Sequence, residues 1–366
     1  MTAARERQAG DAVPVGHRSP HPAPTPGATA DQAGRSRSGA RRAFLGFRNI
    51  SAVYVFVVLF IVFAMWVPET FLASTTWRTL LDNGSITALL AVGLVLPLAS
   101  GVFDLALGAQ LGLGAILVAW FLVDKDVAAP IAVILTLSIG GLVGLASALL
   151  IVRAKVDSFI ATLGMSSILA ALITWLSGGQ QILELGAGFQ RLGLSSVLGL
   201  TSAFWIMILV AAVVSYFLEF TPAGRLVYAT GGNIEAARLA GVRTSLVIVT
   251  CLVVNGVVAS FCGVLVSSRL STGDPTIGPS YLLPAIAAVF LGSTQFRGGR
   301  YNVWGTVVAV YVLATGVKGL QLAGAPVWIP DMFNGVALLV AVAGAKYQRS
   351  PGRLSAVRKT LRLGRQ

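Results

Sequence analysis

Charged residues are scarce in this sequence of 366 residues. Asp, Glu, Lys and Arg make up 11% of the chain, against 55% for hydrophobic residues, and the mean hydropathy is +0.81. Soluble domains carry about 25% charged residues. A chain this poor in charge could not cover its surface in water, so we expect an integral membrane protein. The net charge of +13 does not indicate a nucleic-acid partner, because the basic residues lie in the tails and short loops, where they report membrane topology.

Histidine and cysteine are nearly absent. Both histidines, His17 and His21, precede the first apolar run, which excludes a His-based metal or catalytic site in the apolar part of the chain. The two cysteines, Cys251 and Cys262, share one apolar run. Eleven residues of helix rise about 16 Å, beyond the ~7 Å between Cα atoms that a disulfide tolerates. We expect both cysteines to be packing residues.

The motifs of common enzymes are also missing. None of the five lysines follows a glycine, which excludes the phosphate-binding loop G-x-x-x-x-G-K-[ST]. The chain therefore should not hydrolyse ATP itself, and we expect no catalytic residues, metal or cofactor of its own. No Ser/His/Asp set or carboxylate pair lies in the apolar runs, so an enzyme within the membrane is not indicated.

What the sequence does contain is long apolar runs. A membrane-spanning helix needs about 17–25 such residues. Ten runs predict an all-α, polytopic membrane protein, with a disordered tail at 1–48, a transmembrane domain at 49–347 and a basic tail at 348–366. The predicted helices lie at 51–67, 78–97, 102–123, 128–152, 158–177, 201–219, 244–268, 280–294, 302–321 and 329–347.

The distribution of Lys and Arg predicts the sidedness. With both tails in the cytoplasm, 22 of the 27 basic residues face inside, as the positive-inside rule requires. Of the other five, Lys318 lies near the end of a run and can snorkel. This topology places residues 231–242 in the cytoplasm and the loop 178–200 outside.

The segment 231–242, "GGNIEAARLAGV", is polar between two apolar runs. Asn233 is a good N-cap residue, Glu235 suits the helix dipole and can pair with Arg238, and Gly241 fits a left-handed C′ position. The pattern predicts a helix at 233–240. Isolated helices under about 12 residues are marginal in water, so this one should dock on something, although an ordinary capped loop helix is the alternative.

Asp104 is the principal acidic candidate within the runs. Its position predicts either a cap for the helix that begins near 102 or a direct role in transport. Ion-coupled secondary transporters commonly carry intramembrane Asp, Glu or His. Such a transporter is the alternative hypothesis for the function of this chain.

Three unusual elements occur in order: "FIATLGM", "GGNIEAARLAGV" and "AIAAVFLG" followed by "GGR". Together with "GVFDLALGAQLGLGA", they resemble the permease subunits of ribose/xylose/galactose-type ABC importers, over about residues 80–345. The resemblance implies a type II-like ABC importer permease fold in the cytoplasmic membrane. It also implies a second permease copy or paralogue, a partner ATPase that binds ATP, and an extracytoplasmic solute-binding protein that delivers a monosaccharide or similar small polar solute.

The resemblance also implies site residues. The candidates for coupling to the ATPase are Gly231, Gly232, Asn233, Glu235, Ala236, Ala237, Arg238, Leu239 and Gly241. The candidates for the pathway or gate are Asp104, Phe159, Thr162, Gly164 and Gln180.

The chain departs from the family pattern at several positions near the starts of two predicted helices, those at 102–123 and 280–294. Ala106 stands where the family usually has Ser, and Val102-Phe103 where it has Gly-Ile. Leu282 and Pro284 replace two acidic positions. Buried polar groups discriminate between hydroxyl-rich ligands. The loss of these two groups therefore leaves the identity of the substrate undetermined, but it does not change the expected class of transporter.

Overall fold

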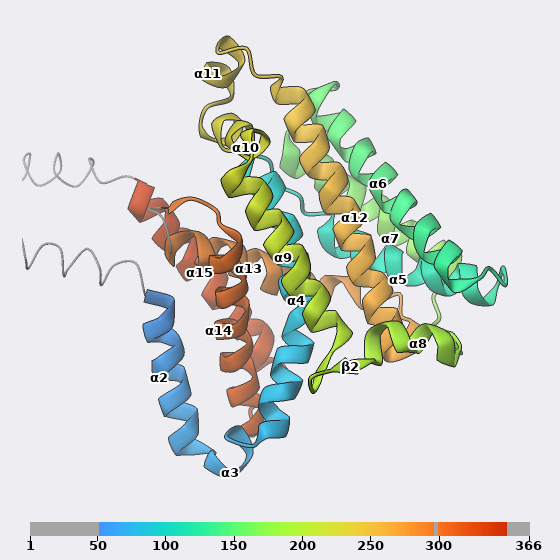
Figure 1. Cartoon of the computed structure of the whole chain (residues 1–366), viewed down its shortest axis with the longest axis vertical. Coiled ribbons are helices and arrows are strands. Elements are labelled where there is room, and N and C mark those ends of the chain that lie inside the picture. Colours follow the sequence, from blue (N-terminus) through green and yellow to red (C-terminus); the bar gives the residue numbers. More distant parts are fainter. Residues whose placement is uncertain (1–50, 296–298, 350–366) are drawn as a thin grey trace, which may run out of the picture. The chain divides into compact units, whose positions relative to one another are not determined.

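A computed structural model describes residues 51–295 and 299–349 of the chain. The tail predicted at 1–48 and nearly all of the one at 348–366 lie outside the described residues. Each predicted apolar run lies in a helix (Figure 1). These helices are α2 Ser51–Trp66, α4 Ser74–Ala99, α5 Leu107–Val123, α6 Ala129–Val152, α7 Ser158–Ser177, α9 Ser202–Phe220, α12 Thr244–Leu270, α13 Gly278–Gln295, α14 Val303–Leu322 and α15 Ile329–Arg349.

Six of these helices are long and apolar enough to cross a membrane: α4, α6, α7, α9, α12 and α14. The apolar stretches of α2, α5, α13 and α15 are shorter. The all-α membrane class is therefore confirmed, with six candidate spans among the described residues.

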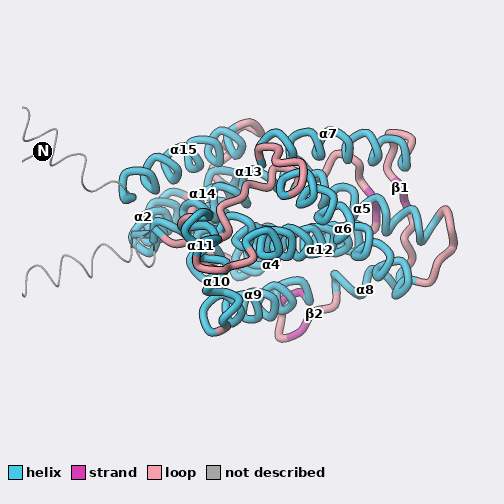
Figure 2. The backbone as a smooth tube through the Cα atoms, turned by 90° about the horizontal axis from the view of Figure 1, so that it is seen from above, coloured by secondary structure: helices cyan, strands magenta, loops and turns pink. Residues whose placement is uncertain are grey.

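Helices α4 and α12 form the centre. Helix α4 is buried along almost all of its second half and packs against α9, α12, α13 and α14, while α12 also packs against α5 and α6. Seen from above, α4 and α12 lie between α9 on one side and α13 on the other (Figure 2). Small residues on α6 let it approach α12 closely, because Cβ atoms at Gly140 and Gly144 would overlap Ser260 and the Leu252 carbonyl group of α12.

One helix boundary differs from the sequence prediction, and one helix was not predicted. Helix α5 begins at Leu107 instead of 102, because residues 100–106 leave the helix through Gly101, whose φ is +87°. A further helix, α10 Pro222–Gly232, precedes the predicted one at 233–240. It starts where Thr221 accepts a hydrogen bond from the Gly224 N–H and Pro222 occupies the first turn, a combination typical of helix starts.

The loop predicted at 178–200 is partly ordered. It contains α8 Ala187–Leu194 and the strand β1 Ile182–Leu183, which pairs with β4 Thr272–Gly273. The neighbouring strands β2 Ser196–Val197 and β3 Leu200–Thr201 form a hairpin, and the short α3 Pro68–Phe71 follows α2.

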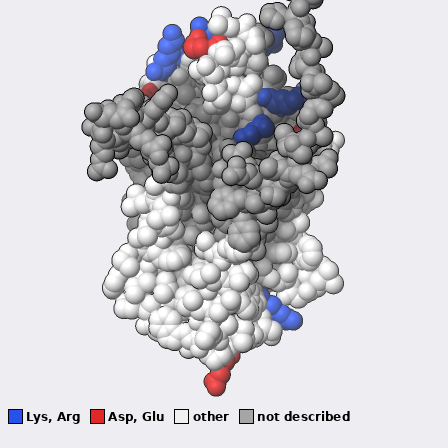
Figure 3. Space-filling view, turned by 90° about the vertical axis from the view of Figure 1, so that its left-hand side faces the viewer, with Lys and Arg blue, Asp and Glu red and all other residues white. Residues whose placement is uncertain are grey.

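Helix α8 and the helix α11 Ile234–Leu239 lie at opposite ends in Figure 1, as the predicted sidedness requires of their loops. On the face shown in Figure 3, charged side chains lie toward two ends and the uncovered surface between them carries none.

Candidate functional site

Helix α11 has the predicted capping geometry. The Asn233 side-chain oxygen accepts a hydrogen bond from the Ala236 N–H at 3.0 Å, and Glu235 pairs with Arg238 at 3.0 Å. Gly241 has φ +85°, the left-handed conformation expected after a helix end. The helix has six residues, one turn and a half, so its shape depends on these caps and on what it packs against.

The exposure of α11 changes which residues could contact a partner. Ala237 is 6% exposed and packs against its own chain, so its expected place in a coupling contact stays a prediction that its burial does not favour. Leu239 is 86% exposed, and Ala236 and Ala240 are also exposed. An exposed apolar side chain at the end of a helix is a candidate contact for a partner protein.

Gly231 and Gly232, predicted as coupling positions, are the last residues of α10. A Cβ atom at Gly231 would overlap the Ala99 carbonyl group, at the end of α4, whereas one at Gly232 would meet no atom within 4 Å. Gly231 thus places the end of α10 directly against the end of α4.

Asp104 lies just beyond that contact and is 1% exposed. One carboxylate oxygen accepts a hydrogen bond from the Ala106 N–H at 3.0 Å, and the other accepts one from the Asn255 side-chain amide of α12 at 2.8 Å. The N-cap residue of α5 is Ala106, two residues after Asp104. Asp104 is therefore not the N-cap residue of this helix. Asp104 instead joins the break between α4 and α5 to α12.

Four aromatic rings from separate elements gather beside this break. The Phe103 ring lies 4.4 Å from that of Phe159, at the start of α7, and 6.2 Å from that of Phe290 in α13. Phe290 in turn lies 6.0 Å from Tyr301. By the predicted sidedness this cluster is at the cytoplasmic end. Phe103, which departs from the family pattern, provides one of the two inner rings of this cluster, and Phe290 provides the other.

The other predicted pathway residues do not converge. Thr162 is buried and donates its hydroxyl hydrogen bond to the Ser158 carbonyl within α7. Gly164 is exposed on the same helix, with space around it. Gln180 follows the far end of α7, about 30 Å from Phe159 at 1.5 Å per residue. Among these candidates, Phe159 therefore lies close to the Asp104 region, whereas Gly164 and Gln180 do not.

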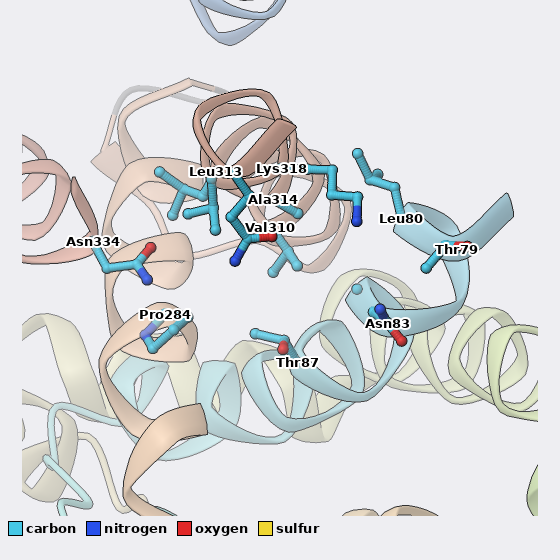
Figure 4. Close-up of a pocket in the computed structure, with 13 residues that line it drawn as sticks. Thr79, Leu80, Asn83, Thr87, Pro284, Val310, Leu313, Ala314, Lys318 and Asn334 are labelled. Atoms are coloured by element: carbon cyan, nitrogen blue, oxygen red, sulfur yellow. The ribbon is translucent and has the colours of Figure 1, made fainter. Parts of the chain in front are cut away.

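The sequence prediction missed a cavity of about 260 Å³ between α4, α13, α14 and α15 (Figure 4). By the predicted sidedness it belongs to the outer half of the protein. Its apolar wall is Leu80, Pro284, Val310, Leu313, Ala314 and Val317, and its polar lining is Thr79, Asn83, Thr87, Lys318, Gln321 and Asn334.

A signal for this cavity was present in the sequence. Thr79, Asn83 and Thr87 recur every four residues, so they share one face of α4. A polar stripe of this kind in a membrane helix faces a partner helix or a wet cavity.

Comparison with known proteins identifies relatives. Residues 78–342 match the family model described as the permease component of branched-chain amino acid transport systems. The chain is 35% identical to the ribose import permease of Bacillus subtilis, over 78% of this chain and 88% of that protein. It is 31% identical to the ribose import permease of Haemophilus influenzae, over 80% and 92%. It is also 31% identical to the L-arabinose ABC transporter permease of Azospirillum brasilense, over 82% and 88%. No solved structure matches the chain significantly.

Proposed function

Because the chain belongs to the family of permease components matched over residues 78–342, we propose that it is the membrane permease of an ATP-driven ABC importer for a monosaccharide or similar small polar solute. The observation that carries this proposal is the similarity along about four fifths of the chain to relatives named as sugar import permeases. A relative from Salmonella is named as an autoinducer 2 import permease, which extends the solutes to another small polar molecule.

The proposed architecture has ten membrane crossings, with both termini in the cytoplasm. The four helices with shorter apolar stretches cross together with the six long ones, since each connects two of them or closes the bundle. A permease of this kind lies in the cytoplasmic membrane.

The proposed machinery divides the work among subunits. A separate ATPase binds and hydrolyses ATP, and α11 docks on it through its exposed face around Leu239. A second permease copy or paralogue completes the pathway, and an extracytoplasmic binding protein delivers the solute to the end that carries α8. A short helix fixed by its own caps transmits displacement, whereas an unstructured loop would absorb it.

The decisive experiment is co-purification of the chain with its genomically neighbouring ATPase and binding protein. In proteoliposomes, ATP hydrolysis and uptake should both rise when the binding protein is loaded with its solute. Ribose, arabinose and leucine are the first solutes to compare, because the relatives and the family description name ribose, arabinose and branched-chain amino acids. Uptake by the chain alone, driven by an ion gradient without ATP, would show a secondary transporter instead.

A further inference from the structure

The outer cavity carries a single charge. Of the thirteen residues that line it, Lys318 of α14 is the one that is charged, and none is acidic. In Figure 4 the Lys318 and Asn334 side chains reach toward the space from different helices. No ion pair joins Lys318 to an acidic residue in the described part of the chain. The neighbouring Asp82 is engaged elsewhere, since its carboxylate accepts hydrogen bonds from the Thr201 N–H and hydroxyl group.

Several polar groups of the cavity have no protein partner. Asn334 is 8% exposed, and within residues 51–295 and 299–349 its side chain forms no hydrogen bond. The side chains of Thr87, which is half-buried, and Gln321, which is exposed, also form no hydrogen bond in this described region. Asn83, in contrast, accepts a hydrogen bond from Arg269 at 2.9 Å. None of these polar atoms is among the sealed, unsatisfied atoms of the described residues, so the cavity offers its hydrogen-bonding capacity to a bound molecule or water.

The rest of the cavity lining includes apolar, uncharged residues from several helices. Pro284 stands within α13, where it contributes a ring and neither a side-chain charge nor a backbone N–H. Val310 and Leu313 add apolar surface from α14, the helix that also carries Lys318. At about 260 Å³ the cavity is just below the usual range of about 300–1,000 Å³ for sites that hold drug-sized ligands. A molecule the size of a monosaccharide suits it.

We propose that this cavity binds a small hydroxyl-bearing solute that carries one anionic group, a carboxylate or a phosphate. Lys318 pairs with the anion, Asn334, Thr87 and Gln321 bind hydroxyl groups, and the wall at Pro284 packs against the C–H face of the solute. A cation in a partly enclosed cavity without a carboxylate selects against neutral molecules of the same shape, because only an anion pairs with its charge. The inference rests on the proposed importer function and specifies its solute.

The test measures direct binding to the full-length permease in nanodiscs, with ribose, ribonate and ribose 5-phosphate as probes. At least one of the two anions should bind at least tenfold more tightly than ribose and raise the melting temperature, and the better anion distinguishes a carboxylate from a phosphate site. Lys318→Met should remove the preference, and Lys318→Arg should retain most of it. Lys125→Met is the matched control, because Lys125 lies over the Trp120 ring outside the cavity.

A second pair of variants isolates charge from shape. Pro284→Asp should weaken binding of the preferred anion at least tenfold, whereas Pro284→Asn, of similar size and uncharged, should weaken it less than threefold. The inference would be overturned if ribose and both anions bind equally, if neither anion binds, or if Lys318→Met and Pro284→Asp leave the preference unchanged. The importer function is tested separately, by ATP-dependent uptake of a neutral solute by the assembled importer. Such uptake would support the importer function even if the inference about the anion is overturned, so failure of one proposal can be told from failure of the other.

Discussion

Gly231 of α10 packs against the carbonyl group of Ala99, the last residue of α4, without room for a side chain between them. A Cβ atom at Gly101 would in turn lie 3.2 Å from the Gly231 Cα atom. These contacts join the segment that carries α11 to the end of α4, five residues before Asp104. A displacement of α11 therefore reaches the break between α4 and α5 through backbone contact.

The two adjacent glycines of α10 provide a matched test of that contact. Gly231→Ala should lower the free energy of unfolding by about 1–3 kcal/mol, because the added methyl group overlaps the α4 backbone. Gly232→Ala should be neutral or stabilising by up to about 1 kcal/mol, since it meets no atom and Ala favours helix. Thermal unfolding of the purified permease measures both. Equal stability of the two variants would show that α10 and α4 can separate without cost.

Leu239 tests the docking role of α11. Leu239→Asp should leave the permease folded, because the side chain is 86% exposed, but should weaken binding of the ATPase at least tenfold, about 1.4 kcal/mol. Leu198, 87% exposed in the hairpin at the other end, is the control, and Leu198→Asp should leave ATPase binding unchanged. Binding is measured by co-purification and titration. If Leu239→Asp binds the ATPase normally, α11 is a connector.

The sequence predicted regular and locally specified features well. The apolar runs predicted the helices to within a few residues, and Asn233, Glu235, Arg238 and Gly241 predicted the ends of α11, because caps depend on neighbours along the chain.

Features that depend on distant contacts were not predicted. The inward orientation of Ala237 follows from the packing of α11 on its own chain. Asp104 meets a partner 151 residues away, so its local position suggested only a cap. The outer cavity combines four helices, and only its α4 stripe was visible in the sequence.

The predicted sidedness can be tested in intact cells with an impermeant thiol reagent. Both native cysteines are buried and form no disulfide, so the parent chain should label little. Leu198→Cys should label from outside, and Leu239→Cys only after the cells are opened, since these two positions are nearly equally exposed at opposite ends. The reverse pattern would invert the topology derived from the basic residues.

The bond between Asp104 and Asn255 predicts an asymmetric response to substitution. Asp104→Asn should change the free energy of unfolding by less than about 1 kcal/mol. The new side chain keeps one oxygen for the Ala106 N–H, and its amide can donate to the Asn255 side-chain oxygen, which has no partner among the described residues. Asp104→Leu removes both acceptors and leaves buried donors at Ala106 and Asn255 unpaired, so it should cost at least about 2 kcal/mol.

Asn255→Leu provides the complementary variant. It leaves one oxygen of the buried Asp104 carboxylate without its donor, so it should destabilise more than Asp104→Asn does. Unfolding and ATP-dependent uptake are measured on the same three proteins. If the role of Asp104 is to stabilise the fold, uptake per folded molecule of Asp104→Asn should remain within about threefold of the parent, because its hydrogen bonds persist. Loss of uptake in a stable Asp104→Asn protein would show instead that the negative charge itself acts in the pathway or gate.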